Sequence, residues 1–288
     1  MENILELQQV SKTFPKSNFT LKNVTFSLPY GAILGFVGEN GAGKTTTIGC
    51  ILNTITKDSG TVKLFGQEML DADTILREKI GVVYDGDNFP PYWTAKQLSE
   101  VMEGLYTQWD NSLFQKYLED FQLPAKQKIK HYSRGMTMKL AIAAALAHRP
   151  ELLILDEATS GLDPIMRDEM LDVFLEFVQE ENHSILLSSH ITSDLEKVAD
   201  YITFIHNGKL IMTVSKNDLA YNYAVMRCKE SQFLTVDPND ILAYRKRDFQ
   251  IDVLVSNGKE AQRKYKGVVI DHVSVDEIML LLVKGERV

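Results

Sequence analysis

The chain has 288 residues, of which 44% are hydrophobic and 24% charged, an ordinary globular composition that allows one large domain with or without a small one. Its formal net charge of −8 argues against a surface built mainly to bind nucleic acid. Two cysteines, Cys50 and Cys228, provide neither a disulfide framework nor a cysteine metal site, so we expect a reducing cytosol.

Membrane-spanning or secretory segments are not expected. Residues 1–6 are acidic and lack the basic and apolar regions of a secretory signal. The longest apolar stretches, residues 140–147 and 152–155, are far shorter than the roughly 20 residues that a helix needs to cross a bilayer. We therefore expect a chain that does not itself cross a membrane.

The first half of the chain predicts a β layer, a nucleotide-binding unit and a helical insertion. Alternating apolar residues between 4 and 28 predict antiparallel strands. The apolar run 32–37 predicts a buried strand, which leads into a glycine-rich loop and a helix from 43 to about 53. Between about 94 and 147, apolar residues recur at three-and-four spacing. This spacing predicts an inserted helical subdomain over about 86–150.

The second half returns to alternating strands and helices, which predicts a parallel sheet covered by helices. Beyond about 218 the elements become shorter and predict a small C-terminal α+β region, with no flexible linker before it, so we expect it to pack on the main domain. The predicted domains are 1–217 and 218–288. The predicted strands are 152–155, 184–187, 201–205 and 249–255, and the predicted helices are about 163–182, 192–200 and 274–284.

The loop at residues 38–45, Gly-Glu-Asn-Gly-Ala-Gly-Lys-Thr, matches the pattern GxxxxGK[ST]. Its glycines let backbone N–H groups curl around phosphate oxygens, and the next helix presents its positive end. Lys44 is expected to reach the β- and γ-phosphates, and the Thr45 hydroxyl to coordinate Mg²⁺. A purely structural turn is the alternative, and the loop alone also fits a kinase or a GTPase. The predicted nucleotide-binding residues here are Gly38, Asn40, Gly41, Gly43, Lys44, Thr45 and Thr46.

Two carboxylates, Asp156 and Glu157, directly follow the apolar strand 152–155. The carboxyl ends of such strands face the ligand crevice of an α/β sheet. We expect Asp156 to hold Mg²⁺, usually through water, and Glu157 to orient and deprotonate the attacking water. Either carboxylate alone is more simply a solvated strand end. The apolar run and the loop upstream favour the catalytic interpretation.

Further short motifs make residues 3–217 resemble the ATP-binding subunit of an ATP-binding cassette (ABC) transporter. Residues 132–136, Tyr-Ser-Arg-Gly-Met, are similar to the family signature LSGGQ and keep its serine and second glycine. Residues 158–163 follow Glu157 as the family's D-loop does, and His190 ends a strand as its switch histidine does. Phe14 stands where the family places an aromatic residue that stacks on adenine.

The resemblance implies a role for each of these residues. Ser133 and Gly135 would reach the γ-phosphate held by an opposite subunit, Asp163 would link the two sites, and His190 would contact the γ-phosphate and the attacking water. Taken singly, Ser133 is more simply a helix cap and His190 a structural residue. Together and in the family's order, they favour a catalytic centre built from Lys44, Glu157 and His190.

The resemblance also implies a fold and an assembly. The fold is α/β, a P-loop ATPase core with an antiparallel β subdomain and an inserted helical subdomain. The cofactors are ATP and Mg²⁺. The partners are a separately encoded membrane permease and a second ATP-binding subunit, either identical or related, and no nucleic acid. The chain would lie in the cytoplasm, bound to the inner face of the cell membrane.

Similarity to bacterial systems that export drugs, lipids or antimicrobial peptides suggests the direction of transport, and exporters of amphipathic peptides such as phenol-soluble modulins belong here. An importer ATPase is one alternative, and it usually has glutamine at position 85. A soluble cassette acting on ribosomes or DNA is another, which would normally need two fused cassettes, a coiled-coil insert or zinc-binding cysteines. A regulatory nucleotide binder without hydrolysis is disfavoured by Glu157 and His190.

The sequence departs from the family pattern at two positions near the expected site. Asp85 stands where the family's Q-loop has glutamine, and as a carboxylate it can still bind Mg²⁺ or its waters. Arg134 replaces the first glycine of the signature. It either adds positive charge near the γ-phosphate or faces solvent.

An aromatic and proline-rich segment, residues 89–93 with the sequence Phe-Pro-Pro-Tyr-Trp, follows Asp85. The family receives a helix of its membrane subunit in this region, and aromatic side chains in this number favour an interface. The alternative is that they form the hinge and core of the helical subdomain. Both interpretations remain open from the sequence.

Overall fold

The computed structural model describes residues 2–69, 73–86 and 88–287. An antiparallel layer forms its first part, as predicted. Strands β1 (Asn3–Phe14) and β2 (Phe19–Pro29) pair antiparallel with Leu7 opposite Phe26, and β4 (Ser59–Leu64) and β5 (Gln67–Glu68) extend the layer beyond β1. Alternate side chains point into a core because successive residues of a strand face opposite sides. Phe14 ends β1 beside the turn into β2.

Parallel strands in the order β9-β3-β8-β7-β6 form the central part, which confirms the predicted parallel sheet. Strand β10 runs antiparallel to β9 and joins β2, so the two layers form one ten-stranded sheet among the described residues. These strands are β3 (Ile33–Val37), β6 (Ile80–Val83), β7 (Leu152–Asp156), β8 (Ser184–Ser189), β9 (Tyr201–His206) and β10 (Lys209–Ser215).

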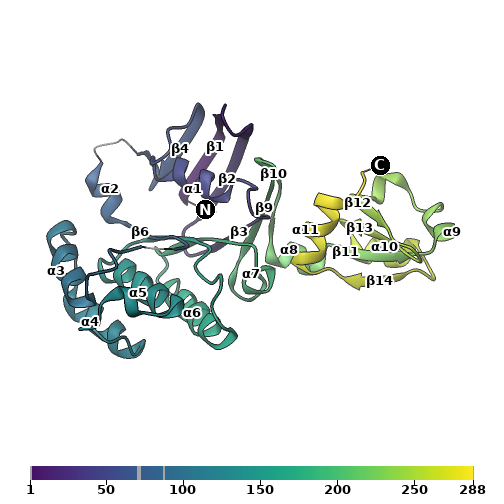
Figure 1. Ribbon diagram of the computed structural model, residues 1–288. Coiled ribbons are helices and arrows are strands. Elements are labelled where there is room, and N and C mark those ends of the chain that lie inside the picture. Colours follow the sequence, from purple (N-terminus) through teal and green to yellow (C-terminus); the bar gives the residue numbers. More distant parts are fainter. Residues whose placement is uncertain (1, 70–72, 87, 288) are drawn as a thin grey trace.

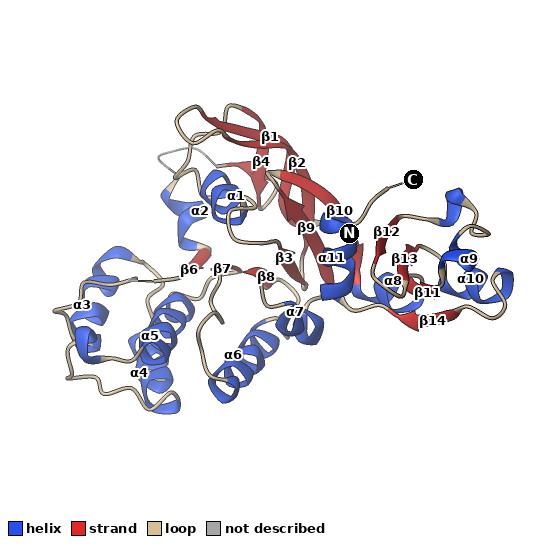
Figure 2. Ribbon diagram, turned by 45° about the vertical axis from the view of Figure 1, so that its right-hand side comes forward, coloured by secondary structure: helices blue, strands red, loops and turns tan. Residues whose placement is uncertain are grey.

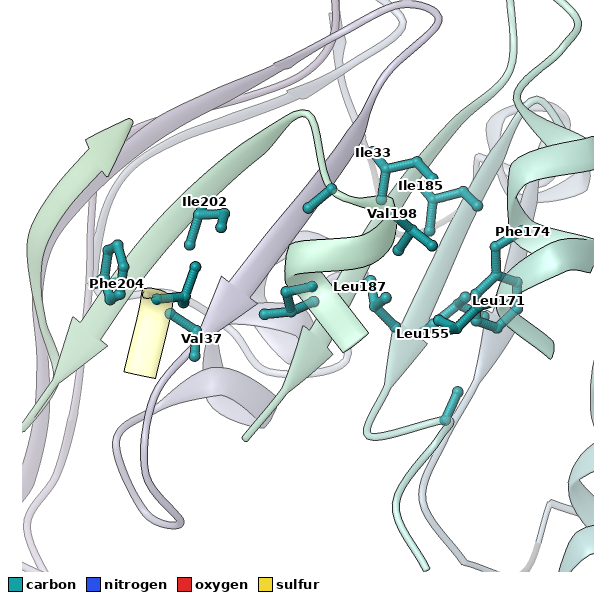
Figure 3. Close-up of a cluster of buried hydrophobic side chains, with 14 of the residues drawn as sticks. Ile33, Val37, Leu155, Leu171, Phe174, Ile185, Leu187, Val198, Ile202 and Phe204 are labelled. Carbon is teal, nitrogen blue, oxygen red and sulfur yellow. The ribbon is translucent and has the colours of Figure 1, made fainter. Parts of the chain in front are cut away.

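Helices cover the parallel sheet. They are α1 (Lys44–Ile51), α2 (Thr74–Glu78), α6 (Pro164–Phe177) and α7 (Thr192–Val198). Figure 3 shows Leu155 and Leu187 of the sheet close to Leu171 and Phe174 of α6, within one buried cluster. Helix α6 ends five residues before the predicted position 182, because the polar segment after Phe177 turns back toward β8.

The helical subdomain projects from the sheet as a separate group (Figure 2). It contains α3 (Ala95–Leu105), α4 (Asn111–Asp120), a short 3₁₀ helix (Ile129–His131) and α5 (Arg134–Ala147). Thr94 and Asp110 cap α3 and α4 through their side-chain oxygens, which satisfies backbone N–H groups at each start. Buried residues such as Leu98, Phe114 and Leu140 form its core.

The sequence left open whether the aromatic segment 89–93 forms a partner interface or the core of the helical subdomain. Different residues of the segment fit each interpretation. Phe89 and Trp93 are partly buried against the core of the helical subdomain. Tyr92 is 67% exposed, with Lys130 Nζ 5.1 Å from the centre of its ring. Tyr92 is therefore the aromatic residue of this segment that is open to a partner.

A four-stranded antiparallel sheet in the order β12-β13-β11-β14 forms the C-terminal region, on the opposite side of the main sheet from α3 and α4 (Figure 1). The predicted strand 249–255 begins only at Ile251, because Phe249 lies exposed in the turn between β12 and β13. The elements are α8 (Lys216–Tyr221), β11 (Ala224–Cys228), α9 (Glu230–Phe233), a 3₁₀ helix (Pro238–Asp240), β12 (Ala243–Lys246), β13 (Ile251–Val255), α10 (Gly258–Lys264), β14 (Val269–His272) and α11 (Val275–Lys284).

The C-terminal region packs on the main domain, as predicted. The Val275 backbone N–H at the start of α11 donates a hydrogen bond to Glu196 of α7, at 2.6 Å. Ile278 of α11 belongs to the same buried cluster as Val198 and Ile202 of the main domain. Within the described ranges, no helix is both long enough and apolar enough to span a bilayer.

Candidate active site

The predicted site residues converge because neighbouring parallel strands end at the same edge of the sheet. The loop 38–43 follows β3, His190 follows β8, and Asp156 ends β7 with Glu157 directly after it. Asp85 lies two residues beyond β6, the next strand along. Four segments distant in sequence therefore contribute to one edge.

Backbone conformation in the loop requires glycine. Gly41 and Gly43 have φ values of +83° and +116°, a region that residues with side chains rarely adopt. A Cβ atom at Gly38 would collide with the carbonyl oxygen of Ile205, whereas the space beside Gly41 is open. The loop thus leaves its backbone accessible at the start of α1, where unpaired N–H groups and the helix dipole favour an anion.

Lys44 lies beneath this loop and is only 6% exposed. Its Nζ atom donates a hydrogen bond to the Gly38 carbonyl oxygen at 2.6 Å and lies 3.0 Å from Glu157 Oε1. The contact with Glu157 is an ion pair without the alignment of a hydrogen bond, and Oε1 accepts no hydrogen bond from any described residue. Lys44 of the phosphate-binding loop and Glu157 after β7 are therefore in direct contact.

Asp156 is held on both of its carboxylate oxygens. Thr45 Oγ1 donates a hydrogen bond to Oδ2 at 2.7 Å, and the Ser188 hydroxyl of β8 donates to Oδ1. The Glu157 backbone N–H donates to Ser188 as well, to its backbone carbonyl oxygen at 3.1 Å and to its hydroxyl at 3.2 Å. Ser188 therefore contacts both acidic residues: its hydroxyl holds the Asp156 carboxylate, and its hydroxyl and backbone carbonyl together hold the Glu157 backbone.

Glu157 has a φ value of +55°, which is uncommon for a residue other than glycine. Its Oε2 atom lies 2.7 Å from Nδ1 of His190, and since a carboxylate only accepts, the histidine nitrogen donates. His190 is not among the residues that line the cleft, and it touches that lining at Glu157. Glu157 is consequently clamped between Lys44 and His190.

A cleft of about 780 Å³ opens above these residues. Phe14 and Phe19 lie at its wall with ring centres 6.4 Å apart. Burial raises the pKa of Tyr84, and the nearby charge of Asp156 raises it further, so this hydroxyl stays protonated as a donor. The lining residues are Phe14, Ser17, Phe19, Asn40, Gly41, Gly43, Lys44, Thr45, Thr46, Tyr84, Asp85, Asp156 and Glu157.

Five of the predicted residues do not line this cleft: Gly38 and His190, which contact its lining residues Lys44 and Glu157, and Ser133, Gly135 and Asp163. Ser133 caps α5, and its hydroxyl accepts a hydrogen bond from the Met136 backbone N–H, as the simpler interpretation of its position expected. Asp163 caps α6 in the same manner. Gly135 packs against Met166, whose sulfur a Cβ atom at this position would strike.

Asp85 lines the cleft, but its carboxylate also pairs with Arg134 across 2.7 Å. The Arg134 side chain is 54% exposed, as the solvent-facing interpretation expected, and it pairs in addition with a carboxylate of its own chain. Sequence reasoning also missed Ser188, Tyr84 and Phe19. The position of Ser188 inside the apolar strand 185–189 could have indicated its role. A hydroxyl buried in such a strand needs a hydrogen-bonding partner.

The comparisons with known proteins agree with this geometry. The family model described as "ABC transporter" matches residues 21–160. The bacitracin transport ATP-binding protein BcrA of Bacillus licheniformis is 31% identical over 87% of this chain and 81% of its own length. The lantibiotic transport ATP-binding protein SrtF of Streptococcus pyogenes is 34% identical over 73% of this chain and 90% of its own.

A solved structure titled as the ATP-binding subunit of an ABC transporter superposes with a TM-score of 0.68 at 26% identity, covering 75% of this chain and 91% of that one. The phosphate-binding loop lies inside the residues that the family model matches. The chain belongs to the ABC transporter family. It is an ATP-binding subunit and an ATPase of that family.

Replacing Ser188 with alanine is expected to slow ATP hydrolysis at least about tenfold, because small displacements of groups at a reacting centre are costly. The free energy of unfolding should fall by about 1 to 2 kcal/mol, since a buried hydrogen-bonding group is lost. A steady-state ATPase assay and chemical denaturation measure the two effects.

The matched control is Ser184→Ala. Ser184 is equally buried in the same strand but donates to the Pro29 carbonyl oxygen, at 3.0 Å, near the opposite end of β8. This variant should lose similar stability and keep its hydrolysis rate. Equal rates in the two variants would show that Ser188 has no part in positioning the acidic residues.

Proposed function

We propose that this cleft binds Mg²⁺–ATP and that hydrolysis there drives export of a substrate of the amphipathic-peptide class through separate membrane subunits. One observation carries the hydrolytic part of the proposal. Glu157 Oε1 is buried beside Lys44 and accepts no hydrogen bond within the described part of the chain. Once Lys44 turns to the phosphates, this oxygen would be left without a partner and could accept a proton from water, as a general base must.

Each residue of the cleft then has a defined task. Lys44 would bind the β- and γ-phosphates, aided by the open backbone of the loop. His190 would hold the Glu157 carboxylate in position and contact the γ-phosphate with its other nitrogen. Phe14 would stack on adenine, with Phe19 beside it. Asn40 and Thr46 complete the phosphate-binding wall.

The residues that would hold Mg²⁺ are Thr45 and Asp156. Both line the cleft, and their oxygens are 2.7 Å apart. Hydroxyl and carboxylate oxygens are the ligands that Mg²⁺ prefers, so this donor set fits the ion. When bound, the ion would neutralise charge on the β- and γ-phosphates. Asp85 is a third oxygen donor at the cleft wall.

We infer that a second ATP-binding subunit, identical or related, completes the site. Ser133 caps α5, Gly135 lies in its first turn and Asp163 caps α6, all outside the cleft of their own chain. Helix α5 has an N-terminus with backbone N–H groups suited to a phosphate. Opposed copies would let each α5 reach the γ-phosphate bound by the other.

A permease subunit would dock beside the nucleotide cleft. A second hollow of about 460 Å³ adjoins it, lined by Phe89, Pro91 and Tyr132 among others. Tyr92 is exposed next to Pro91. The chain would then lie in the cytoplasm at the inner face of the membrane. Relatives named for bacitracin and lantibiotic transport support export of a peptide-like substrate.

We propose the domain division at 217/218, with an ATPase domain over 1–217 and an accessory region over 218–288. Helix α8 crosses this boundary and connects β10 to the second sheet. The accessory sheet has its own buried cluster, which includes Met226, Val253 and Ala261. That separate core supports a unit distinct from the ATPase.

Replacing Glu157 with glutamine is expected to lower the hydrolysis rate by about a hundredfold or more while ATP binding persists, because the general base is lost and the shape of the site is kept. Binding of ATP and release of phosphate measure the two quantities. Glu151→Gln is the control, since Glu151 pairs with Lys79 at the opposite end of β7. Hydrolysis by Glu157→Gln at the unmodified rate would refute the catalytic assignment.

Replacing Tyr92 with alanine is expected to reduce recovery of the permease about tenfold in co-purification, because exposed aromatic side chains anchor interfaces. Tyr221→Ala is a matched control, since Tyr221 is also 67% exposed and also lies near a lysine, Lys259. ATP binding should be unchanged in both variants. If both variants retain the permease equally, Tyr92 is not part of the docking surface.

A further inference from the structure

The two departures from the family pattern, Asp85 and Arg134, meet in space. Arg134 is the first residue of α5, and its Nη2 atom lies 2.7 Å from Asp85 Oδ1 in a loop 49 positions earlier. The contact therefore joins the start of the helical subdomain's longest helix to the segment that leaves β6. Neither residue could be paired with the other from sequence spacing.

Arg134 packs closely against Gly161, where only a residue without a side chain leaves room for the guanidinium group. Gly161 has a φ value of +71°, and a Cβ atom placed on it would lie 2.6 Å from the guanidinium carbon of Arg134. The guanidinium group therefore lies against the loop between Glu157 and Asp163. Arg134 connects three segments of the proposed site: the start of α5, the loop at Asp85 and the loop at Gly161.

Asp85 lies at the boundary between two hollows of the surface. It lines both the nucleotide cleft and the second hollow beside Phe89 and Tyr132, whereas Arg134 lines only the second. A carboxylate in this position is accessible to a cation from the nucleotide side and to Arg134 from the other. The cation that binds the Asp85 carboxylate, either Mg²⁺ or Arg134, therefore determines whether this side chain faces the nucleotide cleft or the second hollow.

The pair is weak enough to exchange. The side chains of Arg134 and Asp85 are 54% and 45% exposed, and exposed ion pairs contribute little because water screens them. Mg²⁺ carries twice the charge of a guanidinium group and prefers carboxylate oxygen. Bound Mg²⁺–ATP can therefore compete with Arg134 for the same carboxylate.

We propose that Arg134 is a positioning residue that holds Asp85 until Mg²⁺–ATP binds, and that Asp85 then exchanges Arg134 for the magnesium ion. The exchange releases the first turn of α5 from the loops at Asp85 and Gly161. That turn contains Gly135 and directly follows Ser133, so cation binding in one cleft frees the surface that faces the second subunit. This inference rests on the proposed function and names a regulatory step of the same site.

The test is the ratio of ATP affinity measured with Mg²⁺ to that measured with EDTA, by calorimetry in a Glu157→Gln background that does not turn over. Arg134→Ala is expected to raise the ratio about threefold to fivefold, because the competing cation is gone. Asp85→Asn is expected to lower it. The double variant should match Asp85→Asn alone, since Arg134 acts only through Asp85.

Arg149→Ala is the matched control. Arg149 forms an exposed ion pair of the same length, 2.7 Å, with Asp110 in the same subdomain but away from the cleft. Its removal should leave the ratio unchanged. Because Arg134 and Asp85 are half-exposed, their variants should also keep the melting temperature within a few degrees of the parent.

Two results would overturn the inference while leaving the proposed function intact. One is an unchanged ratio in Arg134→Ala together with Mg²⁺-dependent ATP binding by the parent. The other is an Arg134 effect that persists in the double variant, or weaker ATP binding in EDTA as well, which would mean that Arg134 contacts the nucleotide itself. A parent that binds no ATP would instead refute the proposed function.

Discussion

The ion pair between Lys44 and Glu157 joins the phosphate-binding loop to the acidic residues after β7. Lys44 belongs to the helix after β3 and Glu157 to the loop after β7, with β8 between these strands. A lysine this deeply buried needs a partner, because an isolated charge in a protein interior is costly. The 3.0 Å contact meets that need and requires the strands to stay in register.

The surrounding hydrogen bonds depend on the same register. Ser188 of β8 reaches Asp156 and the Glu157 backbone only because Asp156 lies opposite Ser188 in the β7–β8 ladder. His190, two residues later, then falls beside the Glu157 carboxylate. A parallel sheet with no slip between β3, β8 and β7 therefore fixes the geometry of the whole centre.

Much of this could be predicted from the sequence, because the phosphate loop and the acidic pair follow apolar strands whose ends must share an edge. Contacts set by tertiary packing could not be predicted. The spacing of Asp85 and Arg134 gives no sign of their pairing, and residues 89–93 give no sign that Trp93 packs inward while Tyr92 faces solvent. Helix α6 also ends earlier than predicted, and the strand predicted from Phe249 begins later. In both places the chain must turn to reach the neighbouring strand, and this turn is set by the tertiary fold.

We propose that one chain holds only half of each ATP site. The most direct measurement is the mass in solution, by sedimentation, of the Glu157→Gln variant saturated with Mg²⁺–ATP and of the same variant with ADP. We expect a dimer with ATP and a monomer with ADP, because γ-phosphate contacts from Ser133 and Gly135 of the opposite copy would hold the pair together. A chain that is saturated with ATP and remains a monomer at all concentrations, alone and with any related ATP-binding subunit encoded beside it, would contradict the account.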